Sequence, residues 1–242
     1  MDPIRMIMFD LSGTTVQDDT AVQDRLYEAA RRYELETSPE EIAYHLGMNK
    51  IHLYQFLIAR SRGRTARIQD LETALDPETE PLAREIFDQY EILMLDHYRQ
   101  GVREVPGAAE TFRWCQANGI KVATDTGFHG RITEAIMDGS GWIRDGLVDI
   151  AVHVESIPGQ RGRPAPFMIF HAMEKLDIQS VHQVVKVGDT PADMLEGHNA
   201  GCRGIVGVLS GAQPVSAWGR YRHTHVIPSV RELPQLIVTE FL

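Results

Sequence analysis

Carboxylate side chains stand where two apolar runs of this 242-residue chain end. Asp10 directly follows residues 4–9, and the next four residues, Leu-Ser-Gly-Thr, form a turn whose backbone N–H groups are able to bind an anion. Asp189 comes shortly after a second run at residues 184–187, and Asp193 stands four residues later. Carboxylate oxygens are the ligands that Mg²⁺ prefers in proteins. This spacing predicts a magnesium site that faces an anionic group.

A hydroxyl group, a glycine and a cation occupy similar places elsewhere in the chain. Thr126 and Gly127 come shortly after an apolar run at residues 120–123, and Arg163 precedes a predicted helix over residues 164–176. Such groups neutralise the negative charge of a phosphoryl or phosphonyl group. Each also has an ordinary structural interpretation, because an aspartate after a strand often forms a turn and most arginines are solvated. The ordered recurrence of all these groups at strand ends favours the chemical interpretation.

The elements that must position these side chains alternate between strands and helices. Because parallel strands end at one edge of a sheet, the residues that follow them meet there. Alternation of this kind indicates βαβ units and an α/β fold with a doubly wound parallel sheet. The predicted strands are residues 4–9, 120–123, 148–152, 184–187 and 205–208, and helices are predicted over 164–176 and 191–200.

Residues 17–102 differ from the rest of the chain, because they contain helical patterns and almost no strand signal. The strand before them has no partner of its own and must join the later strands in one sheet. We therefore predict that this helical block is inserted after the first strand. The expected organisation is an α/β core of residues 1–16 and 103–242 with an inserted all-helical cap of residues 17–102.

The composition bounds the partners and the compartment. Lys and Arg total 24 and Asp and Glu total 34, so the formal net charge is −10. This balance disfavours nucleic acid and an anionic membrane as partners. The chain has two cysteines and no apolar stretch near 18 residues, which disfavours a disulfide framework and a membrane span. Its first residues lack the pattern of a signal peptide, so we expect a cytoplasmic protein.

Taken together, these motifs resemble the haloacid dehalogenase superfamily of hydrolases. The resemblance covers essentially the whole chain, and the helical insertion is similar to that superfamily's cap. It implies a Rossmann-like core and a small-molecule phosphonate or phosphate substrate. The motifs that carry it are residues 10–14, Thr126-Gly127, Arg163-Pro164 and Gly188-Asp189 together with Asp193.

The resemblance also implies a role for each of these residues. Asp10 would be the nucleophile, which forms an aspartyl-phosphate, and Mg²⁺ would be the cofactor. The other implied roles are metal binding by Asp10, Asp189 and the main-chain carbonyl of Ser12, phosphoryl binding by Ser12, Thr126, Gly127 and the catalytic Arg163, and support by Thr14 and Asp193.

Two departures from the commonest pattern point to one branch of the superfamily. Most of its phosphatases carry a second aspartate where Ser12 stands, and most carry lysine where Arg163 stands. Both changes are similar to the phosphonatases, the phosphonoacetaldehyde hydrolases. The cap segment 46–51, Leu-Gly-Met-Asn-Lys-Ile, is similar to the phosphonatase motif that carries a reactive lysine, here Lys50. A lysine that condenses with a carbonyl gives an iminium, which accepts the electrons of a breaking carbon–phosphorus bond.

Other positions differ from the phosphonatase pattern. Leu53 stands where a cap histidine is expected, and Phe128 stands where a tyrosine follows the Thr-Gly pair. These losses remove groups that could move protons during imine formation. They leave open whether the substrate is phosphonoacetaldehyde or a related phosphonate with a 2-oxo group. Phosphonatase caps pair two subunits, so the resemblance also implies a possible homodimer formed through the cap.

The leading hypothesis is a Mg²⁺-dependent hydrolase that cleaves the carbon–phosphorus bond of a 2-oxoalkylphosphonate, with Asp10, Lys50 and Arg163 as catalytic residues. A phosphate monoester phosphatase is the alternative, although Ser12 is a poor acid and general acid catalysis contributes roughly 10²–10⁴-fold. A carbon–halogen hydrolase would not need the carboxylates at 189 and 193. A binding protein that retained the pocket without activity is a fourth possibility.

Overall fold

A computed structural model describes residues 3–47, 49–64, 77–211, 213 and 218–241. The predicted outer limits of the core at residues 1 and 242, and Met48 of the cap motif, lie outside this range. Within it, no helix combines the length and the apolar character that crossing a membrane requires.

The described residues form one six-stranded parallel sheet with the order β3-β2-β1-β4-β5-β6. Strand order reverses beside β1, so the carboxyl ends of β1 and β4 flank the crevice where doubly wound folds bind ligands. The predicted α/β class is thus confirmed. The last strand, β6, has no counterpart among the predicted strands. The bounds are β1 Met6–Asp10, β2 Lys121–Thr126, β3 Ile150–His153, β4 Val184–Gly188, β5 Gly204–Val208 and β6 His225–Ile227.

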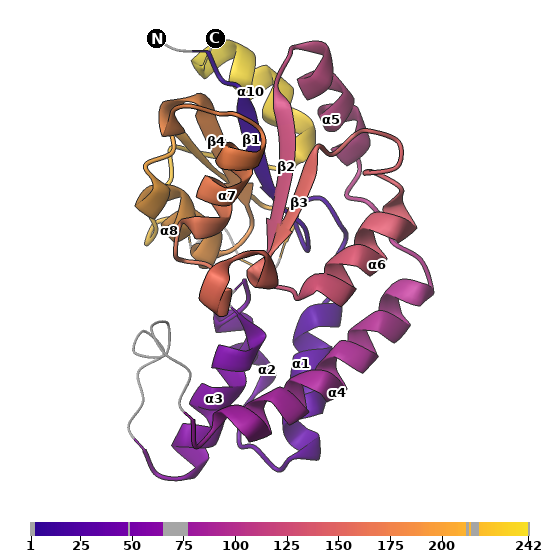
Figure 1. Cartoon of the computed structure of the whole chain (residues 1–242), viewed down its shortest axis with the longest axis vertical. Helices are drawn as coiled ribbons and strands as arrows, with labels where there is room; N and C mark the ends of the chain where they lie inside the picture. The colour runs from indigo at the N-terminus through magenta and orange to yellow at the C-terminus, as the bar shows by residue number, and fades with distance from the viewer. Residues whose placement is uncertain (1–2, 48, 65–76, 212, 214–217, 242) are drawn as a thin grey trace.

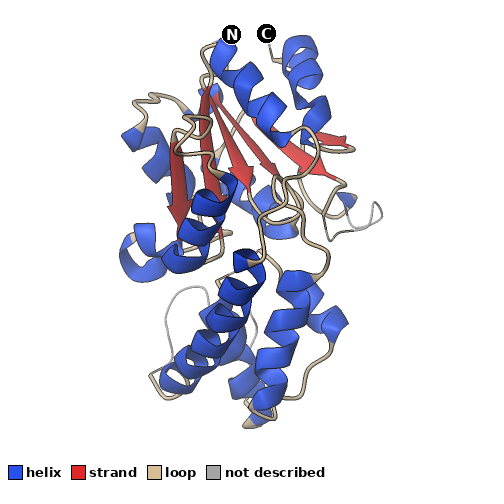
Figure 2. Ribbon diagram, turned by 90° about the vertical axis from the view of Figure 1, so that its right-hand side faces the viewer, coloured by secondary structure: helices blue, strands red, loops and turns tan. Residues whose placement is uncertain are grey.

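Buried side chains of β1 alternate between the two faces of the sheet, as a pleated strand requires. Ile7 and Phe9 pack into the apolar cluster that contains residues of α5, α6 and α10. Met6 and Met8 belong to a second cluster with residues of α7 and α8. Helices therefore cover both faces of the sheet, which explains why β1 is a continuous apolar run (Figure 2).

Of the two core helices predicted by range, the one over 191–200 matches α8, and the one expected from residue 164 begins at Phe167. No range was predicted for α5, α6 or α10. Proline at the first positions of α8 suits a helix start, because its missing N–H would have no helical partner there. The α-helices are α1 Ala21–Arg32, α2 Pro39–Tyr44, α3 Lys50–Ser61, α4 Glu80–Arg99, α5 Ala108–Ala117, α6 Gly130–Ser140, α7 Phe167–Lys175, α8 Pro191–Ala200 and α10 Leu233–Glu240. Short 3₁₀ helices span Val154–Ser156, Pro158–Gln160, Val181–Gln183 and Val230–Glu232.

Helices α1 to α4 lie together beyond the carboxyl ends of the strands (Figures 1 and 2). Leu26 of α1, Tyr54 of α3 and Tyr90 of α4 are fully buried, and the Tyr54 hydroxyl donates to the Leu26 carbonyl oxygen at 3.3 Å. Helix α4 also packs against α6 beside the sheet. The apolar interior of the helical group is therefore continuous with the cluster on one face of the sheet. The group sits over the sheet edge where doubly wound folds bind ligands (Figures 1 and 2). The exact domain limits given above remain a prediction.

Candidate active site

Asp10 is the last residue of β1, and hydrogen bonds to backbone carbonyl oxygens hold the turn that follows it. The Thr15 hydroxyl donates to the Asp10 carbonyl oxygen at 2.9 Å, and the Gly13 N–H donates to the Val16 carbonyl oxygen at 2.8 Å. Gly13 has a φ of +85°, and a Cβ there would lie 2.5 Å from Asp189 Oδ2. Glycine therefore allows this turn to approach the Asp189 carboxylate closely.

Asp189 and Asp193 come from the loop after β4 and the first turn of α8. The Thr14 hydroxyl donates to Asp189 Oδ1 at 3.2 Å, which places Thr14 beside one of the predicted metal ligands. The Thr190 N–H donates to Asp193 Oδ2 at 3.1 Å, and the Asp193 N–H donates to Thr190 Oγ1 at 3.4 Å. This capping box begins α8 and fixes the Asp193 side chain toward the sheet edge.

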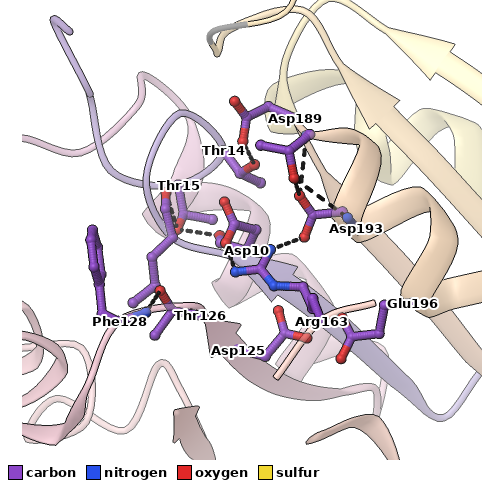
Figure 3. Close-up of polar contacts among 12 residues, drawn as sticks. Asp10, Thr14, Thr15, Asp125, Thr126, Phe128, Arg163, Asp189, Asp193 and Glu196 are labelled. Carbon is purple, nitrogen blue, oxygen red and sulfur yellow. Dashed lines mark hydrogen bonds and ion pairs between the residues drawn. The ribbon is translucent and has the colours of Figure 1, made fainter. Parts of the chain in front are cut away.

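Arg163 joins the two acidic segments, as Figure 3 shows. Its Nη2 donates to Asp10 Oδ1 at 2.8 Å, and its Nη1 donates to Asp193 Oδ1. Arg163 is only 3% exposed, so it is not a solvated surface cation. Burial raises the pKa of Asp10 to about 6, although Arg163 beside it acts in the opposite direction. The raised pKa means that Arg163 does not fully offset the burial of the Asp10 carboxylate, so a further cation beside Asp10 would stabilise its charged form.

Thr126 is the last residue of β2 and Gly127 follows it, and Figure 3 shows Thr126 on the other side of Asp10 from Asp193. The Phe128 N–H donates to Thr126 Oγ1 at 3.1 Å. This bond uses the oxygen of the hydroxyl as an acceptor, so its proton can be donated to an anionic ligand. Thr126 is 3% exposed, which means that a ligand held there would be largely shielded from water.

Lys50, the first residue of α3, is buried although it lies in the helical group. It is 3% exposed, and its Nζ lies 5.5 Å from the centroid of the Phe128 ring. Burial lowers the pKa of Lys50 to about 8, with a smaller effect in the same direction from Arg163. Asp10 is one of the acids that oppose this shift. A lysine with this pKa has a substantial fraction of neutral, nucleophilic amine near neutral pH.

Two contacts of the segment before α3 seat Lys50 over the sheet. Asn49 caps α3 by accepting the Ile51 N–H at 3.0 Å, and its Nδ2 donates to the Gln160 carbonyl oxygen at 3.2 Å. Gly47 has a φ of +88°, and a Cβ there would clash with the Thr190 hydroxyl at the start of α8. Glycine at 47 therefore lets the cap segment contact the core next to the site.

These segments enclose a cavity of about 30 Å³, large enough for one or two water molecules, between the helical group and the sheet edge. Thr14 and Asp193 are not among the residues that line it. Thr14 instead contacts Asp189, and Asp193 contacts Arg163. Leu53 is buried elsewhere on α3. The predicted site residues that the structure brings together around this cavity are Asp10, Ser12, Lys50, Thr126, Gly127, Arg163 and Asp189.

A buried charge cluster that the sequence analysis did not identify contacts the site through Asp193. The Lys186 Nζ forms ion pairs with Asp125 Oδ1, with Asp193 Oδ1 at 3.1 Å and with Glu196 Oε2 at 3.1 Å. All four side chains are fully buried. The three surrounding carboxylates raise the pKa of Lys186, whereas burial raises the pKa of Glu196. The cluster holds Asp193, and through it Arg163, in place.

One sequence signal could have revealed part of this cluster. Lys186 interrupts the otherwise apolar strand Val-Val-Lys-Val, and a lysine in a buried strand requires an acidic partner. Asp125 comes two residues after the predicted strand 120–123, but nothing local indicates that it faces Lys186 two strands away. Glu196 lies on α8 and looks like an ordinary helix residue.

The spacing of the acidic side chains shows whether a divalent cation fits the site. Asp10, Asp189 and Asp193 are buried and each offers a carboxylate oxygen within 4.8 Å of the others. This donor set, made only of oxygen atoms, fits Mg²⁺. A second group with the same spacing, Asp125, Asp193 and Glu196, already surrounds the Lys186 ammonium. Within the first group Asp193 also forms ion pairs with Arg163 and Lys186, so Asp10 and Asp189 are the candidate metal ligands and Asp193 stands beside them.

A family model also matches the chain over the segments that build this site. The haloacid dehalogenase-like hydrolase family matches residues 4–201, which is most of the chain. The chain belongs to this family and is a hydrolase. The resemblance inferred from the motifs at the strand ends is confirmed.

Curated relatives of the chain include phosphonoacetaldehyde hydrolases, and solved structures share its fold. A phosphonoacetaldehyde hydrolase from Parabacteroides distasonis is 36% identical over 128 residues, which are 53% of this chain and 47% of that protein. The phosphonoacetaldehyde hydrolase from Bacillus cytotoxicus is 25% identical over 99% of this chain and 88% of its own length. A phosphonoacetaldehyde hydrolase-like protein from Oleispira antarctica has the same fold, with a TM-score of 0.78 and 21% identity over 98% of this chain and 92% of that one.

Proposed function

We propose that the protein hydrolyses the carbon–phosphorus bond of a 2-oxoalkylphosphonate, either phosphonoacetaldehyde or a close relative. The observation that carries this proposal is the position of Lys50, which lines the same cavity as Asp10 although 39 residues separate them between positions 11 and 49. Burial keeps part of its amine neutral. An amine of this kind beside a phosphoryl-binding pocket supports activation of a carbonyl next to phosphorus.

The reaction begins at Lys50. Its amine attacks the carbonyl carbon, water leaves, and an iminium forms. Asp10 then attacks phosphorus, the carbon–phosphorus bond breaks, and its electron pair enters the iminium to give an enamine. Protonation of the enamine carbon and addition of water release the methyl carbonyl product and restore Lys50. Water finally cleaves the aspartyl-phosphate and releases phosphate, which restores Asp10.

This route explains why the site has Ser12 in place of a second acid. A phosphate ester leaves as an alkoxide, which needs a proton from a general acid. The enamine leaving group needs none at that moment, because the iminium takes up its electrons. Ser12 and Lys50 therefore serve the same reaction.

The other residues neutralise and orient the phosphonate. Arg163 faces the phosphoryl position from beside Asp10, and the Thr126 hydroxyl and Gly127 N–H bind from the opposite side. Asp10, Asp189 and the Ser12 carbonyl would hold Mg²⁺, with Thr14 and Asp193 as support. The cation would supply charge neutralisation between the nucleophile and the phosphonate. A homodimer formed through the cap remains a prediction, as does a cytoplasmic location.

Borohydride trapping tests this proposal. Purified protein with Mg²⁺ and phosphonoacetaldehyde should release phosphate, and borohydride added with the substrate should inactivate it. Mass spectrometry of the digest should then find the reduced adduct on the peptide that contains Lys50. Lys121→Arg is a matched control, because Lys121 is exposed and forms an ion pair with Asp149.

The outcomes separate the two candidate reactions. Loss of trapping in Lys50→Arg, with normal trapping in Lys121→Arg, would support carbon–phosphorus cleavage. Efficient hydrolysis of phosphate monoesters, with no borohydride-sensitive activity on any 2-oxoalkylphosphonate, would overturn the proposal in favour of the phosphatase. Chelation by EDTA should abolish phosphate release, and added Mg²⁺ should restore it.

A further inference from the structure

A second cavity lies next to the active site, between α4 and the start of α6. Its volume is about 250 Å³, and Ile51, Phe87 and His129 form its inner surface, with charged side chains at its rim. Lys50 and Phe128 line the active-site cavity. Their neighbours in the sequence, Ile51 and His129, line the second cavity. The two cavities therefore lie side by side along these two segments. Burial is the main cause of a lowered pKa at His129, and the charge of nearby Lys50 adds to it.

His129 gives the second cavity a polar group that protein atoms do not satisfy. The side chain is 4% exposed, and its ring lies 4.1 Å from the Phe87 ring, measured between centroids. Within the described part of the chain, neither ring nitrogen has a hydrogen-bond partner. Buried polar groups normally have one, so a histidine left in this state points to a ligand. Burial lowers the pKa of His129 to about 4, so the ring is neutral and offers one donor and one acceptor.

The charges at the rim disfavour an anionic group in the second cavity. Both guanidinium groups already form ion pairs, Arg84 with Glu80 at 2.7 Å and Arg131 with Glu91. Two further carboxylates, Asp88 and Glu155, line the rim as well. A carboxylate placed there would meet more negative than positive charge. An uncharged hydroxyl group, which both donates and accepts, matches the neutral His129 ring better.

We infer that the substrate is a ketone whose carbonyl carbon carries a hydroxyl-bearing alkyl group, and that this group occupies the second cavity and hydrogen-bonds to His129. The inference rests on the proposed function, because attachment to Lys50 sets the position of the carbonyl carbon. The phosphonate then binds beside Asp10, and the substituent extends past Phe128 on the other side. Ile51 and Phe87 contact its methylene groups, and the histidine selects its hydroxyl end.

A matched set of substrates tests the inference. The set consists of phosphonoacetaldehyde and four ketones that carry a methyl, propyl, hydroxyethyl or carboxyethyl group on the carbonyl carbon. The propyl and hydroxyethyl ketones have the same size, so their kcat/KM ratio isolates the hydroxyl group. In the wild-type protein this ratio should be about 5 to 10 in favour of the hydroxyl, the expected value of one buried hydrogen bond.

Two variants and one control locate the effect. His129→Leu should bring the hydroxyethyl-to-propyl ratio to about one. Phe87→Trp should fill the second cavity and lower turnover of the hydroxyethyl ketone relative to the methyl ketone, which keeps the test valid if the first variant fails to fold. His52→Leu is the matched control, because His52 is also a buried histidine but is not among the residues that line either cavity. Its hydroxyethyl-to-propyl ratio should equal that of the wild type.

The possible results distinguish failure of this inference from failure of the proposed function. Equal kcat/KM for the hydroxyethyl and propyl ketones, an unchanged ratio in His129→Leu, or a preference for the carboxyethyl ketone would overturn the inference. Any of these results together with borohydride trapping by phosphonoacetaldehyde would leave the proposed function intact. Failure of every compound in the set to be trapped at Lys50 would instead overturn the proposed function.

Discussion

Lys186 and Lys50 are both buried lysines, but the regions that surround them treat the charge in opposite ways. Lys186 is 0% exposed and forms ion pairs with three carboxylates, which raise its pKa. Lys50 is 3% exposed and lies over the Phe128 ring, and burial lowers its pKa to about 8. The sheet region thus keeps its lysine permanently charged as a structural element. Under the proposed function the lysine of the helical region is the reactive one, and the sheet region would carry out phosphorus chemistry while the helical region carries out carbonyl chemistry.

The largest effect should come from the sheet region, because both proposed and alternative reactions need its nucleophile. Asp10→Asn should reduce phosphate release by at least about 10⁴-fold from a 2-oxoalkylphosphonate and from any phosphate monoester. Steady-state phosphate assays measure this loss. Asp138→Asn, a change on the exposed side of α6, is the control and should retain activity. Substantial turnover by Asp10→Asn would show that another residue attacks phosphorus.

Lys50→Arg should separate the two regions, because arginine keeps the positive charge but cannot form an imine. Phosphate release from phosphonoacetaldehyde should fall by about 10³-fold or more, the scale of a lost covalent step. Slow side activity on p-nitrophenyl phosphate should change by less than about threefold. The ratio of the two kcat/KM losses measures how far Lys50 acts on the carbonyl group alone. Equal losses on both substrates would mean that Lys50 acts only as a charge in phosphoryl binding.

Replacing each lysine by methionine should change stability in opposite directions. Lys186→Met leaves three buried carboxylates without their cation and should destabilise the fold by about 3 to 5 kcal/mol. Lys50→Met removes a charge that burial disfavours, and should stabilise the fold by up to about 3 kcal/mol at pH 7. Urea unfolding followed by circular dichroism gives both values.

The pH dependence of the Lys50→Met effect follows from the lowered pKa. Below pH 8 Lys50 is protonated in the folded and unfolded states, so its burial costs the full amount. Between about pH 8 and 10.5 the folded protein binds fewer protons, and wild-type stability rises with pH. The advantage of Lys50→Met should therefore shrink over this range. Destabilisation by Lys50→Met at pH 7 would show that its acidic neighbours outweigh burial.

The smallest effect concerns the pH profile of the wild-type protein. Because only the neutral amine attacks a carbonyl, kcat/KM for phosphonoacetaldehyde should rise about tenfold per pH unit up to about 8 and then level off. Arg163 favours the neutral amine, whereas Asp10, Asp18 and Asp193 oppose it. The profile for p-nitrophenyl phosphate should lack this limb. A limb shared by both substrates would assign the titration to the sheet region.

The sequence alone determined the α/β class and the set of residues that gather at the sheet edge. Asp10 and Thr126 end buried strands and Asp189 follows one, and parallel strands bring their carboxyl ends to one edge whatever lies between them. The short strand β6 escaped prediction, because its three residues include a histidine and its pairing with β5 is not a local property.

Only the tertiary structure decided how each charge behaves. The sequence shows Lys50 and Lys186 as two lysines, and nothing local indicates that one meets an aromatic ring and the other meets three carboxylates. The second cavity is also invisible in the sequence, because Phe87 and His129 come from α4 and the loop before α6. Periodic patterns report which face of an element is buried, whereas a pKa or a cavity depends on side chains that distant segments bring together.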